Sequence, residues 1–291
     1  MFNRVTKAVF PVAGMGTRFL PATKASPKEM LPVVDKPLIQ YAAEEAIEAG
    51  IDTLVFITGR HKRAIADHFD KAYELEAQLE EKQKIEMLEE VRNILPKGVS
   101  VVHIRQAEAL GLGHAVMCAK PVIGDEPFAV LLADDLVYDK SEHTIAQMQP
   151  IFRKYGRSIL ATETVPAEET DKYGIVSTTP IEDRIGQVNG IVEKPKPADA
   201  PSDQAVIGRY VLTPRIFHHL ENLKPGAGGE LQLTDAIAAL MEEETVMSYN
   251  FKGKRYDCGS KLGYLQANVE YALRHHKVGP DFRDYLKTLE V

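Results

Sequence analysis

The chain carries a group of glycines and cations near its start, in the stretch KAVFPVAGMGTRFLPATKASPKEMLPV. The apolar run 8–13 has the length of a buried strand and leads into Gly14 and Gly16, which lack a Cβ and let backbone N–H groups approach an anion. Arg18 adds a planar set of donors that suits phosphate oxygens, and Lys28 adds a mobile positive charge. This stretch is therefore predicted to hold a triphosphate. Its predicted nucleotide contacts are Ala13, Gly14, Gly16 and Thr17.

The spacing of these glycines argues against the two commonest nucleotide-binding loops. A dinucleotide-binding fold has GxGxxG after its first strand, but Phe19 stands where the third glycine would be. A P-loop places four residues between its glycines, whereas one residue separates Gly14 from Gly16. The stretch therefore indicates a nucleotide site of another kind, with an ordinary strand-to-helix turn as the alternative interpretation.

The overall composition is that of a globular protein with a large core, since 44% of the 291 residues are hydrophobic and 26% are charged. A net charge of −7 provides no general basic surface, so we expect neither a nucleic-acid nor a membrane partner. Cys118 and Cys258 lack metal-type spacing and are expected to be buried thiols in a reducing compartment. With neither a leader pattern nor an apolar stretch of ~20 residues, the chain is predicted to be cytoplasmic.

Strand-length apolar runs alternate with helical patterns along the first half of the chain. This alternation, with strands apolar on both faces, is typical of an α/β protein whose mostly parallel sheet is covered by helices on both sides. In such sheets ligands bind beyond the carboxyl ends of the strands, where Gly14, Gln106 and Asp134 all fall. The predicted strands are 8–13, 53–58, 99–104, 128–133 and 159–164, and the predicted helices are 38–49, 63–69 and 144–155.

From about residue 165 the pattern changes to shorter strands with more proline and glycine, which predicts a smaller lobe joined to the first sheet. The predicted elements of this part are strands 174–177, 187–193 and 205–212 and helices 233–243 and 261–274, with a surface loop at 195–201. The segment 72–95 is long, charged and periodic, which predicts a helix. That helix either packs on its own subunit or contacts another subunit.

Six blocks, in order along the chain, resemble the signature of the sugar-nucleotide pyrophosphorylases, the nucleotidyltransferases that join a nucleoside triphosphate to a sugar 1-phosphate. The first and longest reads GxGTRxLPxTKxxPKEMLPxxDKPxI. The others are GLGHA at 111–115, VEKP at 192–195, GRYV at 208–211, LQLTDA at 231–236 and YDCG at 256–259. The resemblance runs from about residue 6 to about residue 275 and is strongest to bacterial members that use UTP and glucose 1-phosphate.

This resemblance implies a single Rossmann-like nucleotidyltransferase domain, of the glycosyltransferase-A type, over residues 1–291. The implied nucleotide-binding part is about 5–165, the sugar-side lobe is about 166–260, and the C-terminal helices are 261–291. The resemblance also implies a Mg²⁺ cofactor, UTP and glucose 1-phosphate as substrates, and a homo-oligomer, either a dimer or a tetramer.

The implied reaction is attack by a phosphate oxygen of glucose 1-phosphate on the α-phosphorus of UTP, without a covalent enzyme intermediate. The sugar phosphate is already anionic, so catalysis depends on alignment and charge neutralisation, for which the implied cations are Arg18, Lys28 and Lys194. Asp134 and Asp257 are the implied metal ligands. The family usually has Leu-Pro-Asp and then an apolar residue, but this chain reads LADD, so Asp135 remains an alternative to Asp134.

The resemblance places the uracil base at Gln106 and at the backbone of Gly111. An amide offers both a donor and an acceptor, which matches the N3–H and O4 edge of uracil. Glu29 is a further candidate for contact with the nucleoside. His114 is expected to cap or pack in the following helix, because the reaction needs no proton to be abstracted.

The sugar is expected at Glu193 and Lys194, where the carboxylate would accept from two hydroxyls and the lysine would meet the sugar phosphate. Adjacent residues of a regular strand face opposite sides, so this pair requires a bend in the chain, which Pro195 favours. Gly174 and Gly208 are expected to let the backbone approach the sugar ring.

Two other functions are alternatives to this one. A related enzyme that uses dTTP or another hexose phosphate is compatible with Gln106, which fits either pyrimidine. A non-catalytic paralogue that binds a sugar nucleotide would be expected to lose the Thr17-Arg18 end of the loop or an acidic ligand, and this chain keeps both.

Overall fold

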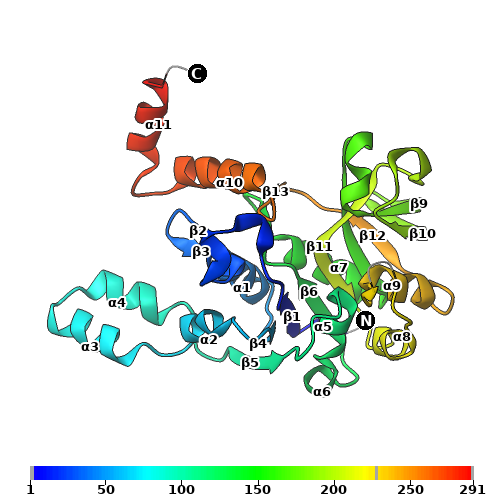
Figure 1. Cartoon of the computed structure of the whole chain (residues 1–291), viewed down its shortest axis with the longest axis horizontal. Helices are drawn as coiled ribbons and strands as arrows, with labels where there is room; N and C mark the ends of the chain where they lie inside the picture. Colours follow the sequence, from blue (N-terminus) through cyan, green and yellow to red (C-terminus); the bar gives the residue numbers. More distant parts are fainter. Residues whose placement is uncertain (1–2, 227–228, 290–291) are drawn as a thin grey trace.

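The computed structural model describes residues 3–226 and 229–289. Within these ranges one nine-stranded sheet runs through the molecule in the order β5-β4-β1-β6-β11-β8-β12-β10-β9 (Figure 1). The first four strands of this order are parallel to one another, as the strand–helix alternation predicts. They are β5 (Ser100–Arg105), β4 (Thr53–Thr58), β1 (Lys7–Val12) and β6 (Phe128–Leu131).

Helices cover both faces of the sheet, because its strands are apolar on both sides. In β1, Ala8, Phe10 and Val12 point into one core, and Val9 points into the other. The first core is closed by α1 (Leu38–Glu48), α2 (Arg63–Phe69) and α7 (Thr144–Tyr155). The second is closed by α5 (Leu112–Met117), α6 (Lys120–Ile123), α8 (Ile216–Asn222) and α9 (Leu233–Met241). The predicted α/β architecture is confirmed.

The second half of the sheet is more mixed than the first. Its strands are β11 (Gln204–Leu212), β8 (Ile159–Thr164), β12 (Met247–Asn250), β10 (Ile185–Glu193) and β9 (Gly174–Glu182). β11 is antiparallel to β6 and β8, and β10 is antiparallel to β12 and β9. Ala205 of β11 also pairs with Ile175 of β9, one residue from the pair that Gln204 forms with Thr164. The start of β9 and the end of β10 therefore lie near the carboxyl end of β8.

Smaller elements surround the sheet. The strands β2 (Pro32–Val33) and β3 (Lys36–Pro37) pair with each other, β7 (Asp135–Tyr138) pairs with β13 (Lys254–Asp257), and these elements pack with α10 (Lys261–Arg274). At the periphery lie α11 (Gly279–Lys287) and the pair α3 (Tyr73–Glu81) and α4 (Ile85–Arg92) (Figure 1). The periodic segment 72–95 is thus two helices, because Gln83 adopts a left-handed φ of 54° between them. No helix in the described ranges is long and apolar enough to cross a membrane.

Candidate functional site

The glycine-containing segment 13–18, which we call the phosphate loop, follows β1 and is largely exposed to solvent. Gly16 has a φ of 67° and passes Lys28 so closely that a Cβ there would lie 3.0 Å from the Lys28 Cβ, which explains why glycine is required. Its carbonyl accepts a 2.7 Å hydrogen bond from Thr23 Oγ1. A Cβ on Gly14, in contrast, would meet nothing within 4 Å. The loop is anchored at Gly16 and open at Gly14.

The two candidate cations of this region, Lys28 and Arg18, lie near the same carboxylate, that of Asp134. Lys28 Nζ lies 2.5 Å from Asp134 Oδ2, and Arg18 donates to the carbonyl of Gly259 at 3.4 Å. Burial alone would lower the pKa of Lys28, but Asp134 and Glu29 more than offset this and hold its pKa above the ordinary value. Lys28 is therefore a permanent cation at the ends of β1 and β6.

Glu29 lies on the short helical turn Lys28–Met30 and is only 2% exposed. Its carboxylate forms a 2.7 Å ion pair with Lys62, which is itself 6% exposed. Burial raises the pKa of Glu29, and Lys62 offsets this only in part. The sequence predicts Glu29 as a candidate nucleoside contact, and in the structure its carboxylate already has Lys62 as a buried partner.

Asp134 and Asp135 are adjacent in the loop 132–135, which we call the acidic loop, but they have opposite environments. Asp135 Oδ2 accepts from the Gly208 N–H at 2.7 Å, and its Oδ1 accepts from Arg255 at 2.7 Å. The Asp134 side chain is 27% exposed and its ion-pair partner is Lys28. Burial would raise the pKa of Asp134, but Lys28 outweighs this effect and holds the pKa below the ordinary value. Asp135 is a buried structural group, and Asp134 faces the open side.

Two arginines with buried side chains, Arg209 and Arg255, hold the acidic loop in place. Arg209, 1% exposed, forms a bidentate pair with Glu45 of α1 at 2.8–3.0 Å and also donates to the carbonyls of Leu132 and Asp135. These two carbonyls flank Asp134 in sequence, so Arg209 fixes the backbone from which Asp134 projects. Arg255 joins Asp135 to Glu163, because its Nη1 also lies 2.6 Å from the Glu163 carboxylate.

Asp257 is the last residue of β13, and its carboxylate lies near that of Asp134. A Cβ built on Gly259 would lie 3.0 Å from Asp257 Oδ1, 3.1 Å from Asp134 Oδ2 and 3.3 Å from Arg18 Nη1, so these three groups converge on one point. Burial raises the pKa of Asp257, and the nearby carboxylates of Asp135 and Asp134 raise it further. A divalent cation would relieve that repulsion.

The two convergent carboxylates therefore fit Mg²⁺, a hard cation that prefers oxygen ligands and keeps waters and substrate phosphates in its remaining positions. Within the described ranges, no cluster of three or more His, Cys, Asp or Glu side chains could form an all-protein metal site.

Gln106 follows β5, and its buried side chain has a defined orientation. Its Nε2 donates to the carbonyl of Gly111 at 3.2 Å and lies 2.9 Å from His114 Nδ1. Gly111 has a φ of 98°, and a Cβ there would lie 2.8 Å from the Glu230 Cβ and 2.9 Å from the carbonyl of Leu231. Gly111 is thus required both for its conformation and for its packing. The predicted base-binding pair does lie together in the structure. The expectation that the amide offers both a donor and an acceptor to uracil is wrong, because Nε2 is engaged by Gly111 and His114 and only Oε1 is left for the base.

The sugar-side residues meet at the end of β10. Lys194 has a left-handed φ of 46°, and its N–H donates to the carbonyl of Tyr173, so the predicted bend after Glu193 is present. The bend brings Lys194 Nζ within 3.3 Å of Glu193 Oε1. Gly174 lies beside this pair, since a Cβ there would stand 3.4 Å from Glu193 Oε2.

Gly208 is buried in β11 rather than beside Glu193. A Cβ there would lie 2.6 Å from the Leu132 Cβ and 2.8 Å from Asp135 Oδ2. Its N–H donates to Asp135. Gly208 is therefore required for close packing beneath the acidic loop.

Sequence reasoning did not single out several residues that shape the site. Thr234 donates to Glu193 Oε2 at 2.6 Å and belongs to the block LQLTDA, so that motif was an available signal. Arg209 likewise lies in GRYV. For Lys62 and Arg255 no local pattern indicated a partner, because their carboxylates are 33 and 120 residues away in the chain.

Comparisons with known proteins agree with this geometry. A family model described as nucleotidyl transferase matches residues 7–274. The UTP–glucose-1-phosphate uridylyltransferase of Bacillus subtilis is 51% identical over 288 residues, covering 99% of this chain and 98% of that protein. The protein of the same name from Escherichia coli K12 is 50% identical over 292 residues, covering 98% of this chain and 96% of its own length.

Solved structures show the same similarity. A UTP-bound UGPase from Acinetobacter baumannii superposes with a TM-score of 0.92 at 46% identity, covering 98% of this chain and 100% of that chain. A UDP-glucose pyrophosphorylase in complex with UDP-glucose superposes with a TM-score of 0.86 at 46% identity, covering 93% of this chain and 100% of that one. The fold, the convergent site residues and these similarities lead to one conclusion: the chain belongs to the nucleotidyl transferase family.

Proposed function

We propose that this protein transfers the uridylyl group of UTP to glucose 1-phosphate, giving UDP-glucose and pyrophosphate. The observation that carries the proposal is the convergence of Arg18, Asp134 and Asp257 on one point beside Lys28, at the end of the strand that leads into the phosphate loop. Relatives about half identical to this chain over nearly its whole length carry the name of this activity.

The reaction is a direct displacement in which a phosphate oxygen of the sugar phosphate attacks the α-phosphorus and pyrophosphate leaves. UTP carries about −4 and the sugar phosphate about −2, so their repulsion is the main obstacle. Arg18, Lys28 and Lys194 each supply one positive charge toward the reacting groups. Mg²⁺, which Asp134 and Asp257 would hold, would neutralise further phosphate charge when bound. No side chain needs to act as a nucleophile.

The sugar is proposed to lie against the end of β10. Glu193 is held by Thr234, which leaves its Oε1 near Lys194 and able to accept from sugar hydroxyls. The side chain of Lys194 is 56% exposed, so solvent and a ligand can reach its charge. Its charge is proposed to meet the phosphate of the hexose.

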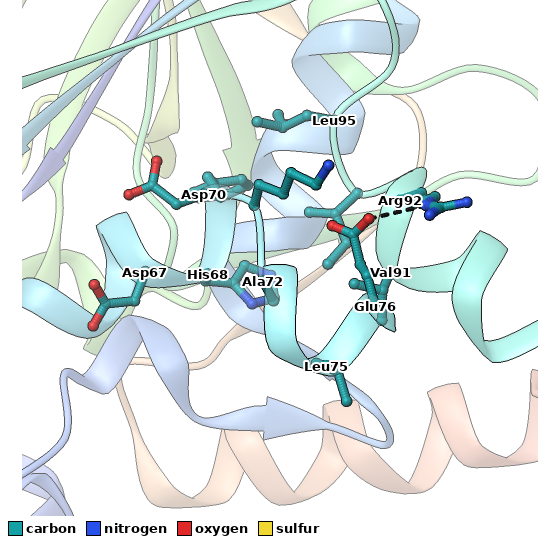
Figure 2. Close-up of a pocket in the computed structure, with 12 residues that line it drawn as sticks. Asp67, His68, Asp70, Ala72, Leu75, Glu76, Val91, Arg92 and Leu95 are labelled. Atoms are coloured by element: carbon teal, nitrogen blue, oxygen red, sulfur yellow. Dashed lines mark hydrogen bonds and ion pairs between the residues drawn. The ribbon is translucent and has the colours of Figure 1, made fainter. Parts of the chain in front are cut away.

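We also propose that the protein is a homo-oligomer. Large apolar side chains are exposed on α3 and α4, namely Tyr73, Leu75, Ile85 and Met87, and on α10, namely Leu262 and Leu265. A groove of about 650 Å³ opens between α2, α3 and α4, with Leu75, Val91 and Leu95 in its apolar wall (Figure 2). Light scattering in solution tests this proposal, and a monomeric mass would overturn it.

The two cysteines of the described chain, Cys118 and Cys258, are free thiols. Free thiols suit a reducing compartment, and we propose the cytoplasm.

The deciding experiment for the function is pyrophosphate release with Mg²⁺ and glucose 1-phosphate, across UTP, dTTP, CTP, ATP and GTP. Release with UTP alone supports the proposal. Comparable release with dTTP would assign a broader nucleotide preference to the same fold. Binding of UDP-glucose without release from any pair would instead favour a non-catalytic paralogue.

The variant Lys194→Ala tests the sugar-side assignment. We expect a higher KM for glucose 1-phosphate and a lower kcat, with the affinity for UTP nearly unchanged, because this lysine is assigned to the second substrate. Steady-state kinetics with each substrate varied in turn measures this split. Kinetics equal to those of the wild type would remove Lys194 from the site.

A further inference from the structure

The side-chain amide of Gln106 uses its nitrogen inside the protein. The carbonyl of Gly111 can only accept a hydrogen bond, so the amide atom 3.2 Å from it must be the donor Nε2. The same Nε2 lies 2.9 Å from His114 Nδ1. An amide nitrogen does not accept, so Nδ1 must be the acceptor and the neutral ring must carry its proton on Nε2.

The oxygen of Gln106 is left for a ligand. No hydrogen bond to Oε1 occurs within the described ranges, although Gln106 as a whole is only 6% exposed. Oε1 is also absent from the fully buried atoms that lack a partner, which are His143 Nδ1, Thr144 Oγ1 and His219 Nε2 in the described chain. The oxygen therefore keeps some exposed surface and has no partner in the described chain, while both N–H groups of the amide are engaged.

We propose that His114 is a specificity-determining residue that fixes the Gln106 amide with its oxygen toward the base and so selects bases that present an imino N–H. Uracil has N–H at its position 3 and donates to Oε1. Cytosine has an unprotonated nitrogen there, which would face Oε1 as acceptor against acceptor. The inference rests on the proposed function, which places the base at Gln106, and deepens it.

Each of the two internal contacts of the amide has its own part in this arrangement. Gly111 immediately precedes α5. The start of this helix is held in place because the N–H of Gly113 donates to the carbonyl of Leu231 at 2.8 Å. The carbonyl of Gly111 engages one N–H of the amide, and His114 engages the other. A turned amide would set Oε1 against the Gly111 carbonyl, acceptor against acceptor, and would require His114 to give up its hydrogen bond at Nδ1 or to move its proton there. Without His114 the second of these costs is gone, so a turned amide whose Nε2 donates to the nitrogen of cytosine is disfavoured by the Gly111 carbonyl alone.

The test compares nucleotide affinities in His114→Phe and His114→Asn. Phenylalanine keeps the ring and removes the acceptor, whereas the Oδ1 of asparagine stands where Nδ1 of histidine was. We expect His114→Phe to reduce the preference for UTP over CTP about tenfold, the worth of one hydrogen bond. We expect His114→Asn to retain most of that preference.

The preference for UTP over dTTP is the internal control, because both bases present the same N3–H edge. It should not change in either variant. A loss of affinity for all nucleotides together, or an unchanged UTP-to-CTP ratio in His114→Phe, would overturn the proposal. A double-mutant cycle with Gln106→Leu adds a second criterion: the two effects must be strongly non-additive, and additivity would mean that His114 does not act through Gln106.

Calorimetric binding without glucose 1-phosphate separates this inference from the proposed reaction. If the wild type binds UTP and prefers it to CTP but releases no pyrophosphate, the reaction fails and the role of His114 is still measured. For a His114→Phe variant that does not fold, ¹⁵N NMR of the wild-type imidazole replaces it. The proposal requires an unprotonated Nδ1 in the free and UTP-bound protein, and a protonated Nδ1 would overturn it.

Discussion

The phosphate loop and the acidic loop follow neighbouring parallel strands, β1 and β6, but the protein holds them very differently. The phosphate loop is exposed and has its clearest fixed point at Gly16, where Thr23 and Lys28 make contact. The acidic loop is held by hydrogen bonds from Arg209, Arg255 and the Gly208 N–H. A loop that wraps a ligand with backbone N–H groups can be completed by that ligand. A carboxylate that must meet its neighbour across the site has to be placed in advance, and this needs buried support.

The largest expected effect separates the two aspartates of the acidic loop. Asp134→Asn should lower kcat/KM about 10³-fold, or ~4 kcal/mol of transition-state stabilisation, because it removes the charge proposed to hold the metal. Initial rates over a Mg²⁺ titration measure this effect. The unfolding free energy of the Asp134→Asn variant should change little, since the ion pair that it loses with Lys28 is partly exposed. Activity within tenfold of the wild type would assign the metal to another group.

The buried support of the acidic loop should carry the next effect. Arg209→Met should lower the unfolding free energy by about 3 kcal/mol, because Glu45 keeps a buried charge without its partner and two loop carbonyls lose a donor. Urea denaturation measures the loss. The double variant with Glu45→Met is the control, since replacing both charges by apolar groups should restore part of the stability. Unchanged stability would show that the loop does not need this pair.

Asp135→Asn should lower stability more than activity, whereas Asp134→Asn should lower activity more than stability. We expect about 2 kcal/mol of lost unfolding free energy, because Arg255 loses one of its two carboxylate partners in a buried site. The loss of activity should be smaller than in Asp134→Asn. Measuring both quantities in both variants tests the assignment, and the opposite ranking would exchange the roles of the two residues.

The smallest effect concerns the phosphate loop and uses two matched glycines. Gly16→Ala should cost about 1 kcal/mol of unfolding free energy, because the left-handed φ of 67° and the Lys28 Cβ at 3.0 Å both disfavour a side chain. Gly14→Ala should leave stability unchanged, since its Cβ would lie in open space. Thermal denaturation of the two variants compares them directly. Equal losses would mean that the loop is anchored along its whole length.

Much of the fold could be predicted from the chain because the signals were local. The strands 53–58 and 159–164 and the helices 63–69, 144–155 and 261–274 coincide with the structure to the residue, since each is an apolar run or an amphipathic period bounded by turn residues. Segment 72–95 shows where this reasoning fails. Its periodicity continues across Gln83, and only the structure shows the left-handed residue that divides it into α3 and α4.

In the candidate site, too, local features could be predicted from the sequence and long-range contacts could not. Local sequence determined which residues are available at the strand ends: the glycines and Arg18 after β1, Gln106 after β5, the aspartates after β6 and the bend after Glu193. The choice between Asp134 and Asp135 was left to the tertiary structure, because two adjacent identical side chains have the same local signals. Gly208, Arg255 and Lys28 come from remote parts of the chain and decide which carboxylate is buried and which faces the site. The orientation of the Gln106 amide was likewise decided by packing, since only the folded loop brings Gly111 and His114 to its nitrogen.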